Sequence, residues 1–399
     1  MTETRPRPLT GIRIVDLSIA LTGPYACALL ADQGADVIKV ERPGIGDIAR
    51  WIGASVNGMS ALYATCNRGK RGIAVDVHTD AGRDIVRDLV ARADVFVQNF
   101  RPGVMERLGL GYDDLAAGRD DLVYVSLSAF GSEGPYGRRG AYDTVIQAYG
   151  GLAASQADPA DGKPVFMRQT AADKITAMYA VQAITSGLLA RERGFGGQHV
   201  EVSMLDAVVS FLWADAAGNE VLLDSDGSFP SSFVQSVQPF EFLDGWGVAT
   251  PTSDADFAAT CRAFGVDGYD DPRVATIGER NKHRDLAKVL STRWHEVART
   301  LTVAEGMARM QAENVPCGVV YTAAELADDP HVQAIGMLET QDHPIVGRIR
   351  QPRHPARFRG TPAQLAGGAP GLGEHTDEIL AELGLADRVD ALRADKVVA

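Results

Sequence analysis

Thr170, Ala171, Ala172 and Asp173 open the longest helical stretch of the sequence. The start of a helix favours an ionised carboxylate, and an ionised aspartate can act as a covalent nucleophile. The same residues also fit a variant capping box, with Thr170 as the N-cap and Asp173 as the third helical residue. From the residues alone both roles stand, and the capping role is the more ordinary one.

A second group of chemically useful residues follows a predicted buried strand. Gln98, Asn99, Phe100 and Arg101 stand together there, before Pro102-Gly103. An amide, an aromatic face and a guanidinium at the end of a strand suit a nucleotide base and a phosphate better than they suit core packing. Phe100 by itself would more often be a core residue.

Basic residues gather near the ends of the predicted strands, where phosphates could meet them. The ordinary alternative for each of them is solvated surface charge. The group consists of Lys39, Arg42, Arg50, Arg68, Lys70, Arg71, Arg101 and Arg107.

Several common chemistries lack their motif. The nearest approach to the Gly-x-Ser-x-Gly of serine hydrolases is FGSEG at residues 130–134, and His295-Glu296 is not followed by the second histidine of a zinc protease. Neither a dinucleotide-binding Gly-x-G-x-x-Gly nor a P-loop occurs, and the four cysteines form no Cys-x-x-Cys pair. We therefore expect no metal site.

The chain has 399 residues and a net charge of −13. That charge argues against a nucleic-acid partner, which needs a basic surface. The apolar stretches are too short and interrupted to span a bilayer, and the first residues lack an apolar signal core. We expect no membrane partner and a soluble, cytoplasmic protein.

The elements that must position these residues alternate between strands and helices. Near-continuous apolar strands separated by amphipathic helices predict an α/β fold with a parallel sheet covered on both faces. The loops after such strands share one edge of the sheet, where ligands bind. The predicted strands are residues 12–17, 35–41, 72–77, 94–100, 122–127 and 199–203, and the predicted helices are 23–33, 81–93, about 172–193, from 204 onward, and 378–383.

The composition changes after residue 220, where Asp, Ser and Phe become more frequent. We expect a large domain over residues 1–220, a smaller domain over 221–325, and a C-terminal segment, 326–399, that returns to the large domain.

Taken together, several motifs resemble the family III CoA-transferases, the group that contains formyl-CoA transferase and crotonobetaine/carnitine CoA-transferase. The resemblance covers nearly the whole chain. Its segments are PLTG at 8–11, GP at 23–24, ADQGADVIKVE at 31–41, NRGKR at 67–71, NFRPGV at 99–104, LGL at 108–110, VPCG at 315–318, DPHV at 329–332 and LGEHT at 372–376.

The resemblance implies a Rossmann-like large domain built from both chain ends, a smaller α+β domain, and an interlocked homodimer. It implies coenzyme A as co-substrate, carried in as acyl-CoA, and a small carboxylic acid as the second substrate. Asp173 matches the catalytic aspartate of the family. The positions matching the cofactor-binding residues are Leu21, Arg42, Val75, His78, Asn99, Phe100, Arg101, Val104, Arg107, Tyr142 and Asp143.

The sequence departs from formyl-CoA transferase at two of these positions. Leu21 stands where that enzyme carries a glutamine that contacts its acid substrate, and His78 replaces a lysine at a phosphate contact. These departures make oxalate an improbable acceptor and favour a more apolar acid.

The mechanism implied is transfer through an aspartyl anhydride and an aspartyl-CoA thioester on Asp173. One alternative is an α-methylacyl-CoA racemase of the same fold. Those enzymes use a histidine beside an aspartate, and this chain has Tyr142 in place of that histidine, beside Asp143. A CoA-binding protein without turnover, with Asp173 as a helix cap, is another.

Overall fold

The computed structural model describes residues 6–158, 161–224, 234 and 237–399. The chain divides into two compact units. The large unit joins Met1–Ala216 to Gly336–Ala399, and the small unit is Ala217–Ile335. Each is described by itself.

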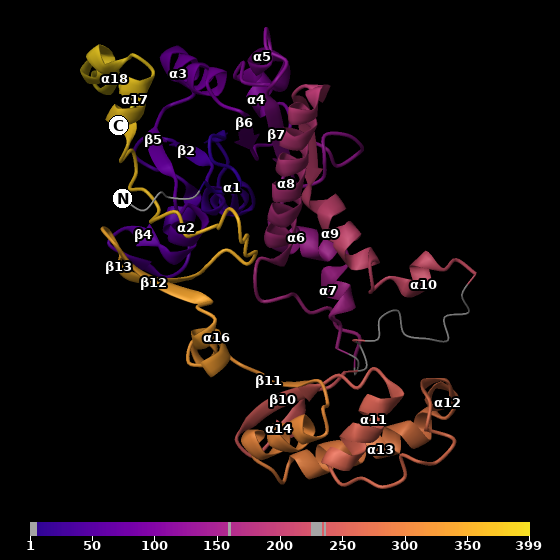
Figure 1. Cartoon of the computed structure of the whole chain (residues 1–399). Helices are drawn as coiled ribbons and strands as arrows, with labels where there is room; N and C mark the ends of the chain where they lie inside the picture. The colour runs from indigo at the N-terminus through magenta and orange to yellow at the C-terminus, as the bar shows by residue number, and fades with distance from the viewer. Residues whose placement is uncertain (1–5, 159–160, 225–233, 235–236) are drawn as a thin grey trace. The chain divides into compact units, whose positions relative to one another are not determined.

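A six-stranded sheet forms the centre of the large unit (Figure 1). Every neighbouring pair of its strands is parallel, which confirms the predicted α/β fold with a parallel sheet. The strand order reverses between β1 and β6, and a crevice at the carboxyl ends of strands opens at such a reversal. In spatial order the strands are β5 (Arg71–Ala74), β2 (Asp36–Glu41), β1 (Arg13–Asp16), β6 (Val95–Gln98), β7 (Val123–Ser128) and β8 (Gln198–Ser203).

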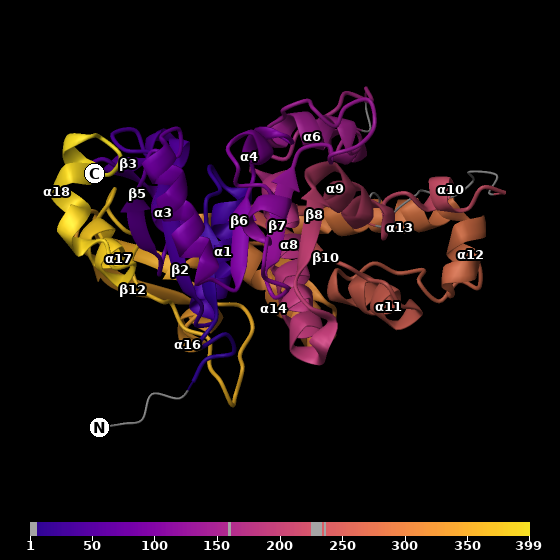
Figure 2. The ribbon, with the colours of Figure 1, turned by 90° about the horizontal axis from the view of Figure 1, so that it is seen from above.

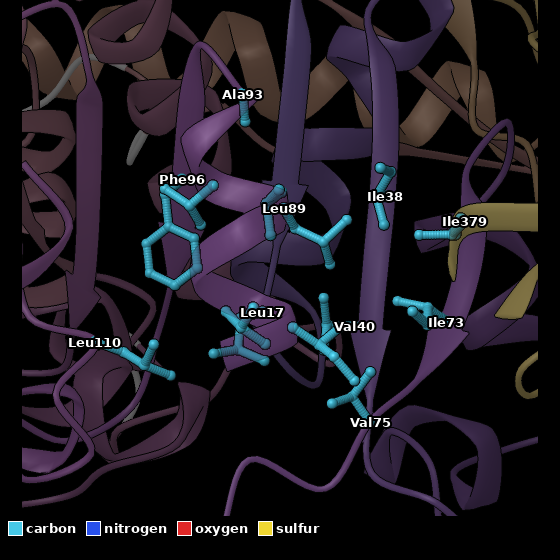
Figure 3. Packing of buried hydrophobic residues seen from close by; sticks show 14 of the residues in the cluster. Leu17, Ile38, Val40, Ile73, Val75, Leu89, Ala93, Phe96, Leu110 and Ile379 are labelled. Atoms are coloured by element: carbon cyan, nitrogen blue, oxygen red, sulfur yellow. The ribbon is translucent and has the colours of Figure 1, made fainter. Parts of the chain in front are cut away.

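Alternate residues of the central strands pack into two separate cores, one on each face of the sheet. Val15 and Ile38 belong to one core, which includes Leu89 of α3 (Asp80–Ala91) and Ile379 of α17 (Thr376–Glu382) (Figure 3). Ile14 belongs to the other core, under α1 (Thr22–Asp32) and α8 (Ala171–Ala190). Figures 1 and 2 show these helices flanking the sheet, with the C-terminal helices beside β5 and α3.

The C-terminal segment contributes to the large unit by packing and by backbone pairing. Ile379 and Leu380 are fully buried in the first core. Val398 forms an antiparallel bridge with Val75, directly after β5. The first and last parts of the chain therefore build one core together.

The remaining elements of the large unit are short. They are the 3₁₀ helices η1 (Ile48–Trp51) and η4 (Ala386–Arg388), the π-helical turn η2 (Arg191–Phe195), the helices α2 (Ala61–Cys66), α4 (Val104–Arg107), α5 (Tyr112–Leu115), α6 (Asp143–Tyr149), α7 (Leu152–Ser155), α9 (Met204–Trp213) and α18 (Val389–Ala394), and the strand pairs β3 (Ser55–Val56) with β4 (Met59–Ser60) and β12 (Leu338–His343) with β13 (Gly347–Pro352).

The small unit packs helices on an antiparallel sheet around Phe240, Phe264 and Trp294. Its sheet runs β11 (Cys317–Val319), β10 (Gly245–Ala249) and β9 (Phe240–Phe242). Its helices are α10 (Gly218–Val221), α11 (Asp254–Ala263), α12 (Ile277–Lys282), α13 (Arg284–Ala298), α14 (Val303–Ala312), α15 (Ala323–Leu326) and α16 (Pro330–Ala334). Among the described residues of both units, no helix is long and apolar enough to cross a membrane.

Candidate active site

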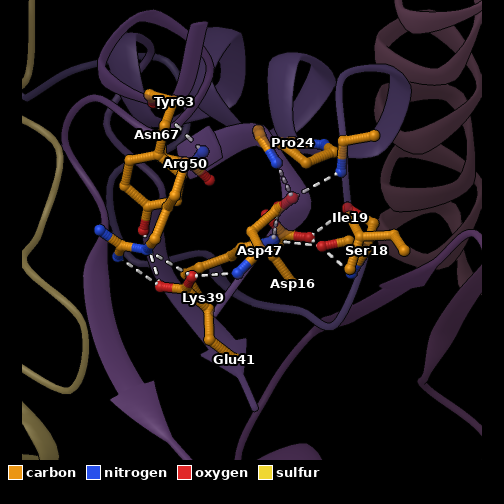
Figure 4. A network of polar contacts seen from close by, with 12 residues as sticks. Asp16, Ser18, Ile19, Pro24, Lys39, Glu41, Asp47, Arg50, Tyr63 and Asn67 are labelled. Atoms are coloured by element: carbon orange, nitrogen blue, oxygen red, sulfur yellow. Dashed lines mark hydrogen bonds and ion pairs between the residues drawn. The ribbon is translucent and has the colours of Figure 1, made fainter. Parts of the chain in front are cut away.

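The loop between β1 and α1, residues 17–21, is anchored by buried charges (Figure 4). Asp16 accepts the backbone N–H of Ser18 at 3.0 Å, and its other carboxylate oxygen pairs with the Lys70 ammonium at 2.7 Å. The Lys39 ammonium donates to the carbonyl oxygen of Ser18 and pairs with Asp47 at 2.9 Å. The side chains of both lysines and of both aspartates are fully buried.

Two more contacts fix the middle of this loop. The Asn99 side chain accepts the N–H of Ile19 at 2.8 Å and donates to its carbonyl oxygen at 2.7 Å. Asp47 accepts the N–H of Ala20 at 2.8 Å and holds that residue at a φ of 68°, in the left-handed region. A non-glycine residue persists there only when its surroundings fix it, so these contacts hold the loop in this conformation.

The anchored loop places Thr22, the first residue of α1, beside the first turn of α8. The Thr22 hydroxyl donates to Oδ1 of Asp173 at 2.5 Å. The next residue, Gly23, packs so closely on Ser18 that a Cβ would lie 2.2 Å from its Oγ, so only glycine fits after Thr22. Asp173 is half-buried in the first turn of α8.

The structure overturns the capping box considered for this helix start. Thr170 is the N-cap, but its side chain makes no capping hydrogen bond. The N–H of Asp173 instead donates to Oδ2 of Asp143 at 3.1 Å. Asp143 therefore satisfies the helix end, and the carboxylate of Asp173 faces Thr22.

The surroundings of Asp173 favour its protonated form. Burial raises the pKa of Asp173 to about 6, the hydrogen bond from Thr22 acts to lower it, and the charge of Asp143 raises it again. Asp143 itself is buried and accepts a hydrogen bond from Gln147 at 2.5 Å. Tyr142, its predicted aromatic companion, is 76% exposed.

A pocket of about 520 Å³ opens at the carboxyl ends of β5, β2, β1 and β6, where the strand order reverses. Leu17 and Ile19 of the anchored loop form part of its wall, so the loop that ends at Thr22 also borders this pocket. Five of the residues predicted to bind the cofactor line it: Arg42, Val75, His78, Phe100 and Val104.

The other predicted residues lie outside the lining of this pocket. Leu21 is buried as the N-cap of α1, and Asn99 is used by the loop. Arg101 and Arg107 are exposed, Arg101 ahead of α4 and Arg107 as its last residue. The guanidinium of Arg101 lies against Gly140, where a Cβ would be 2.6 Å from its Nε.

Five of the eight basic residues that were considered for phosphate contacts form ion pairs within the large unit. Lys39 pairs with Asp47, and Lys70 pairs with Asp16. Arg50 pairs with Glu41, Arg68 with Asp32, and Arg71 with Asp36. In the part of the chain that the structure describes, Arg42, Arg101 and Arg107 form no ion pair. These three remain available to an anion.

Sequence reasoning missed Thr22 and Asp47. Thr22 is 151 positions from Asp173 in the sequence, and only the packing of α1 on α8 brings them together. Asp47 ends the segment KVERPGIGD at 39–47. Nothing in the spacing of that segment indicates that Asp47 contacts residues 20 and 39. Among the described residues, no group of three or more His, Cys, Asp or Glu side chains is placed to hold a metal ion.

The large unit thus combines a parallel sheet, a pocket at the strand ends, and a half-buried aspartate, Asp173, in the first turn of a long helix. The sequence profile of CoA-transferase family III matches residues 9–376. The chain belongs to this family. Its relatives are CoA-transferases by name, and the chain is an acyl-CoA:carboxylate CoA-transferase.

Three comparisons illustrate the relationship. The chain is 34% identical to a succinate–glutarate CoA-transferase of Agrobacterium fabrum, over 96% of this chain and 98% of that protein. It is 31% identical to a succinyl-CoA–D-citramalate CoA-transferase of Chloroflexus aurantiacus, over 98% of each. The crystal structure of a CAIB/BAIF family protein from Brucella suis superposes with a TM-score of 0.80 at 33% identity, covering 95% of this chain and all of that one.

Proposed function

We propose that Asp173 is the covalent nucleophile of the transfer. The observation that carries the proposal is that its carboxylate caps no helix end and faces Thr22. Asp173 attacks the thioester carbonyl to give an acyl–aspartyl anhydride and CoA thiolate. The thiolate then attacks the aspartyl carbonyl, which releases the donor acid and leaves an aspartyl-CoA thioester. The acceptor acid reverses these steps, so the energy of the thioester is retained.

Intact mass tests this chemistry. We would mix the protein with succinyl-CoA, quench, and measure its mass with and without hydroxylamine. An adduct of CoA mass that hydroxylamine removes supports the proposal. Complete absence of such an adduct with succinyl-, glutaryl- and acetyl-CoA would contradict it.

We propose that the strand-end pocket receives part of the CoA. Its apolar lining suits the pantetheine chain, and the exposed Arg42 at its edge suits a phosphate. The strand order agrees with the Rossmann-like description, in which ligands bind where the order reverses.

Filling the pocket should weaken CoA binding. Val104, the first residue of α4, lines the pocket. We expect Val104→Trp to raise the Kd for CoA by about tenfold or more, because a steric change in an apolar pocket costs about 1–3 kcal/mol of binding free energy. Isothermal titration with CoA measures this. Val289→Trp, at a half-exposed position in the small unit, is the matched control and should bind CoA like wild type. Unchanged affinity in Val104→Trp would place CoA elsewhere.

We propose a dicarboxylic acid as acceptor. The Agrobacterium and Chloroflexus relatives are named for succinate, glutarate and citramalate. Glutarate combines a second carboxylate with a short methylene chain, and the glutamine that formyl-CoA transferase uses for its acid is absent at Leu21. Competition between glutarate, butyrate and oxalate for one succinyl-CoA pool measures the preference, and a lead for oxalate or butyrate would contradict the proposal.

The rate should fall as the solution becomes acidic. Because the pKa of Asp173 is raised to about 6, the nucleophile is protonated below that pH and ionised above it. We expect kcat/KM for succinyl-CoA to decline about tenfold per pH unit below pH 6, since this parameter reports the ionisation of the free enzyme. A profile from pH 4.5 to 8 measures it, and a decline that begins only near pH 4 would show that burial does not control this carboxyl.

We propose a homodimer, interlocked as in the family. Large apolar side chains of α8 and α9 are about half exposed in the single chain, among them Met178, Leu189, Phe211 and Trp213. Contiguous exposed apolar surface marks association sites. Light scattering should give twice the chain mass, and a monomer at micromolar concentration would contradict the proposal.

A further inference from the structure

Thr22 contributes to no step of the chemistry described above, yet it touches the reacting carboxylate. Its hydroxyl is 2.5 Å from Oδ1 of Asp173, and its side chain is only 4% exposed. Among the described residues it is the one side chain that donates a hydrogen bond to this carboxylate. The carboxylate of Asp143 accepts the backbone N–H of Asp173 and makes no hydrogen bond to the side-chain oxygens of Asp173.

The position of Thr22 is fixed before any substrate arrives. The preceding loop is bound through Lys39, Asn99 and Asp47, and Gly23 behind it packs directly on Ser18. A donor that is already in place costs no reorganisation when charge develops on its acceptor. The hydroxyl is therefore preorganised toward Oδ1.

We propose that Thr22 is a catalytic residue that stabilises the oxyanion formed on Oδ1 of Asp173 when CoA thiolate attacks the aspartyl carbonyl. This rests on the proposed function. In the first step Oδ2 forms a bond to the thioester carbon, the C–S bond breaks, and Oδ1 becomes the carbonyl oxygen of the anhydride. In the second step the thiolate sulfur bonds to Cγ, and the carbonyl electron pair moves onto Oδ1.

The intermediate then collapses. The electron pair on Oδ1 reforms the carbonyl, the bond between Cγ and Oδ2 breaks, and Oδ2 leaves with the donor acid as its carboxylate. Thr22 keeps its proton throughout and only donates a hydrogen bond. That bond is stronger to an oxyanion than to the neutral carbonyl of the anhydride, so it lowers the barrier of the second step.

The test compares Thr22→Val, which keeps the shape without the hydroxyl, with Thr22→Ser, which keeps the hydroxyl. Rapid-quench intact mass at pH 8 with succinyl-CoA gives the rate of aspartyl-CoA formation. We expect Thr22→Val to be slower by about 100-fold, the usual effect of losing one oxyanion donor, and Thr22→Ser to stay within about tenfold of wild type. The Kd for CoA should be unchanged in both.

A second readout separates this role from packing. Without the donor the anhydride persists longer, and water has more time to attack its succinyl carbonyl, a reaction that places no charge on Oδ1. The ratio of succinyl-CoA hydrolysis to adduct formation should therefore rise in Thr22→Val. The acid limb of its kcat/KM profile should also move to higher pH, because Thr22 lowers the pKa of Asp173.

The outcomes are distinguishable. Equal adduct rates in wild type and Thr22→Val would overturn the role of Thr22 and leave the proposed function intact. Equal losses in Thr22→Val and Thr22→Ser, with no change in the hydrolysis ratio, would also overturn it and assign a packing role. Absence of any adduct in wild type would remove the proposed function and this inference with it.

Discussion

Replacing Asp173 with asparagine is expected to lower the rate of CoA transfer by about 10⁴-fold or more, the scale of losing a covalent nucleophile. The amide keeps the shape and can still accept the Thr22 hydrogen bond, but it carries no charge with which to attack a thioester. Transfer from succinyl-CoA to glutarate, followed by chromatography of the two thioesters, measures the rate. The hydroxylamine-sensitive adduct should vanish in the same protein, and its persistence would place the nucleophile elsewhere.

Stability provides the control that Asp173→Asn is folded. The folded pKa of Asp173, about 6, lies above the ordinary value of 3.8. A raised carboxyl pKa contributes stability below the unfolded pKa, and this is lost as the pH rises through the folded pKa. At pH 8 the ionised carboxylate therefore destabilises the fold. Allowing for partial exposure, asparagine should add about 1 kcal/mol and raise the Tm by about 1–2 °C at pH 8, with no gain at pH 4.

Replacing Lys70 with methionine is expected to reduce the free energy of unfolding by about 3–5 kcal/mol, because it leaves a charge buried without its partner. Burial acts to raise the pKa of Asp16, but the ammonium groups of Lys70 and Lys39 outweigh it and hold that pKa below its ordinary value. Lys70 also donates to Asn67 and to the carbonyl oxygen of Pro24, at 2.8 Å each. Urea denaturation measures the loss.

Two variants bracket this prediction. Asp16→Asn combined with Lys70→Met removes both charges and should recover part of the lost stability. Arg87→Met removes an exposed pair with Asp84 and should cost less than about 1 kcal/mol. If Lys70→Met were no less stable than Arg87→Met, the buried network would not anchor the loop as described.

The sheet could be predicted from the sequence because its strands are buried on both faces. Residues 12–17 and 94–100 each have an apolar centre, Ile14-Val15 and Val95-Phe96-Val97, and each contains an observed strand, β1 and β6. The first turn of α8 was equally visible, so Asp173 was located at a helix start from the sequence. Periodicity and capping are local properties, and local properties can be read along the chain.

The partners of charged residues could not be predicted in this way. Lys70 and Arg42 are alike in the sequence, both near the end of a strand, yet Lys70 is buried against Asp16 and Arg42 is exposed at the pocket. The difference arises from strand order, which brings residues 16 and 70 together across the chain. The contact of Thr22 with Asp173 depends in the same way on how α1 packs on α8.

The buried ion pairs have a consequence for an enzyme that handles activated acyl groups. A lysine amine reacts with thioesters and anhydrides only when it is uncharged. Burial acts to lower the pKa of Lys39, but Asp47, Asp16 and Glu41 outweigh it and raise that pKa, so the side chain stays a protonated ammonium. Lys70 is likewise enclosed with Asp16. Among the described residues, the exposed basic side chains that were predicted to contact the cofactor's phosphates are arginines, Arg42, Arg101 and Arg107. The amine of Lys39 is therefore held in a form that cannot attack an acyl group.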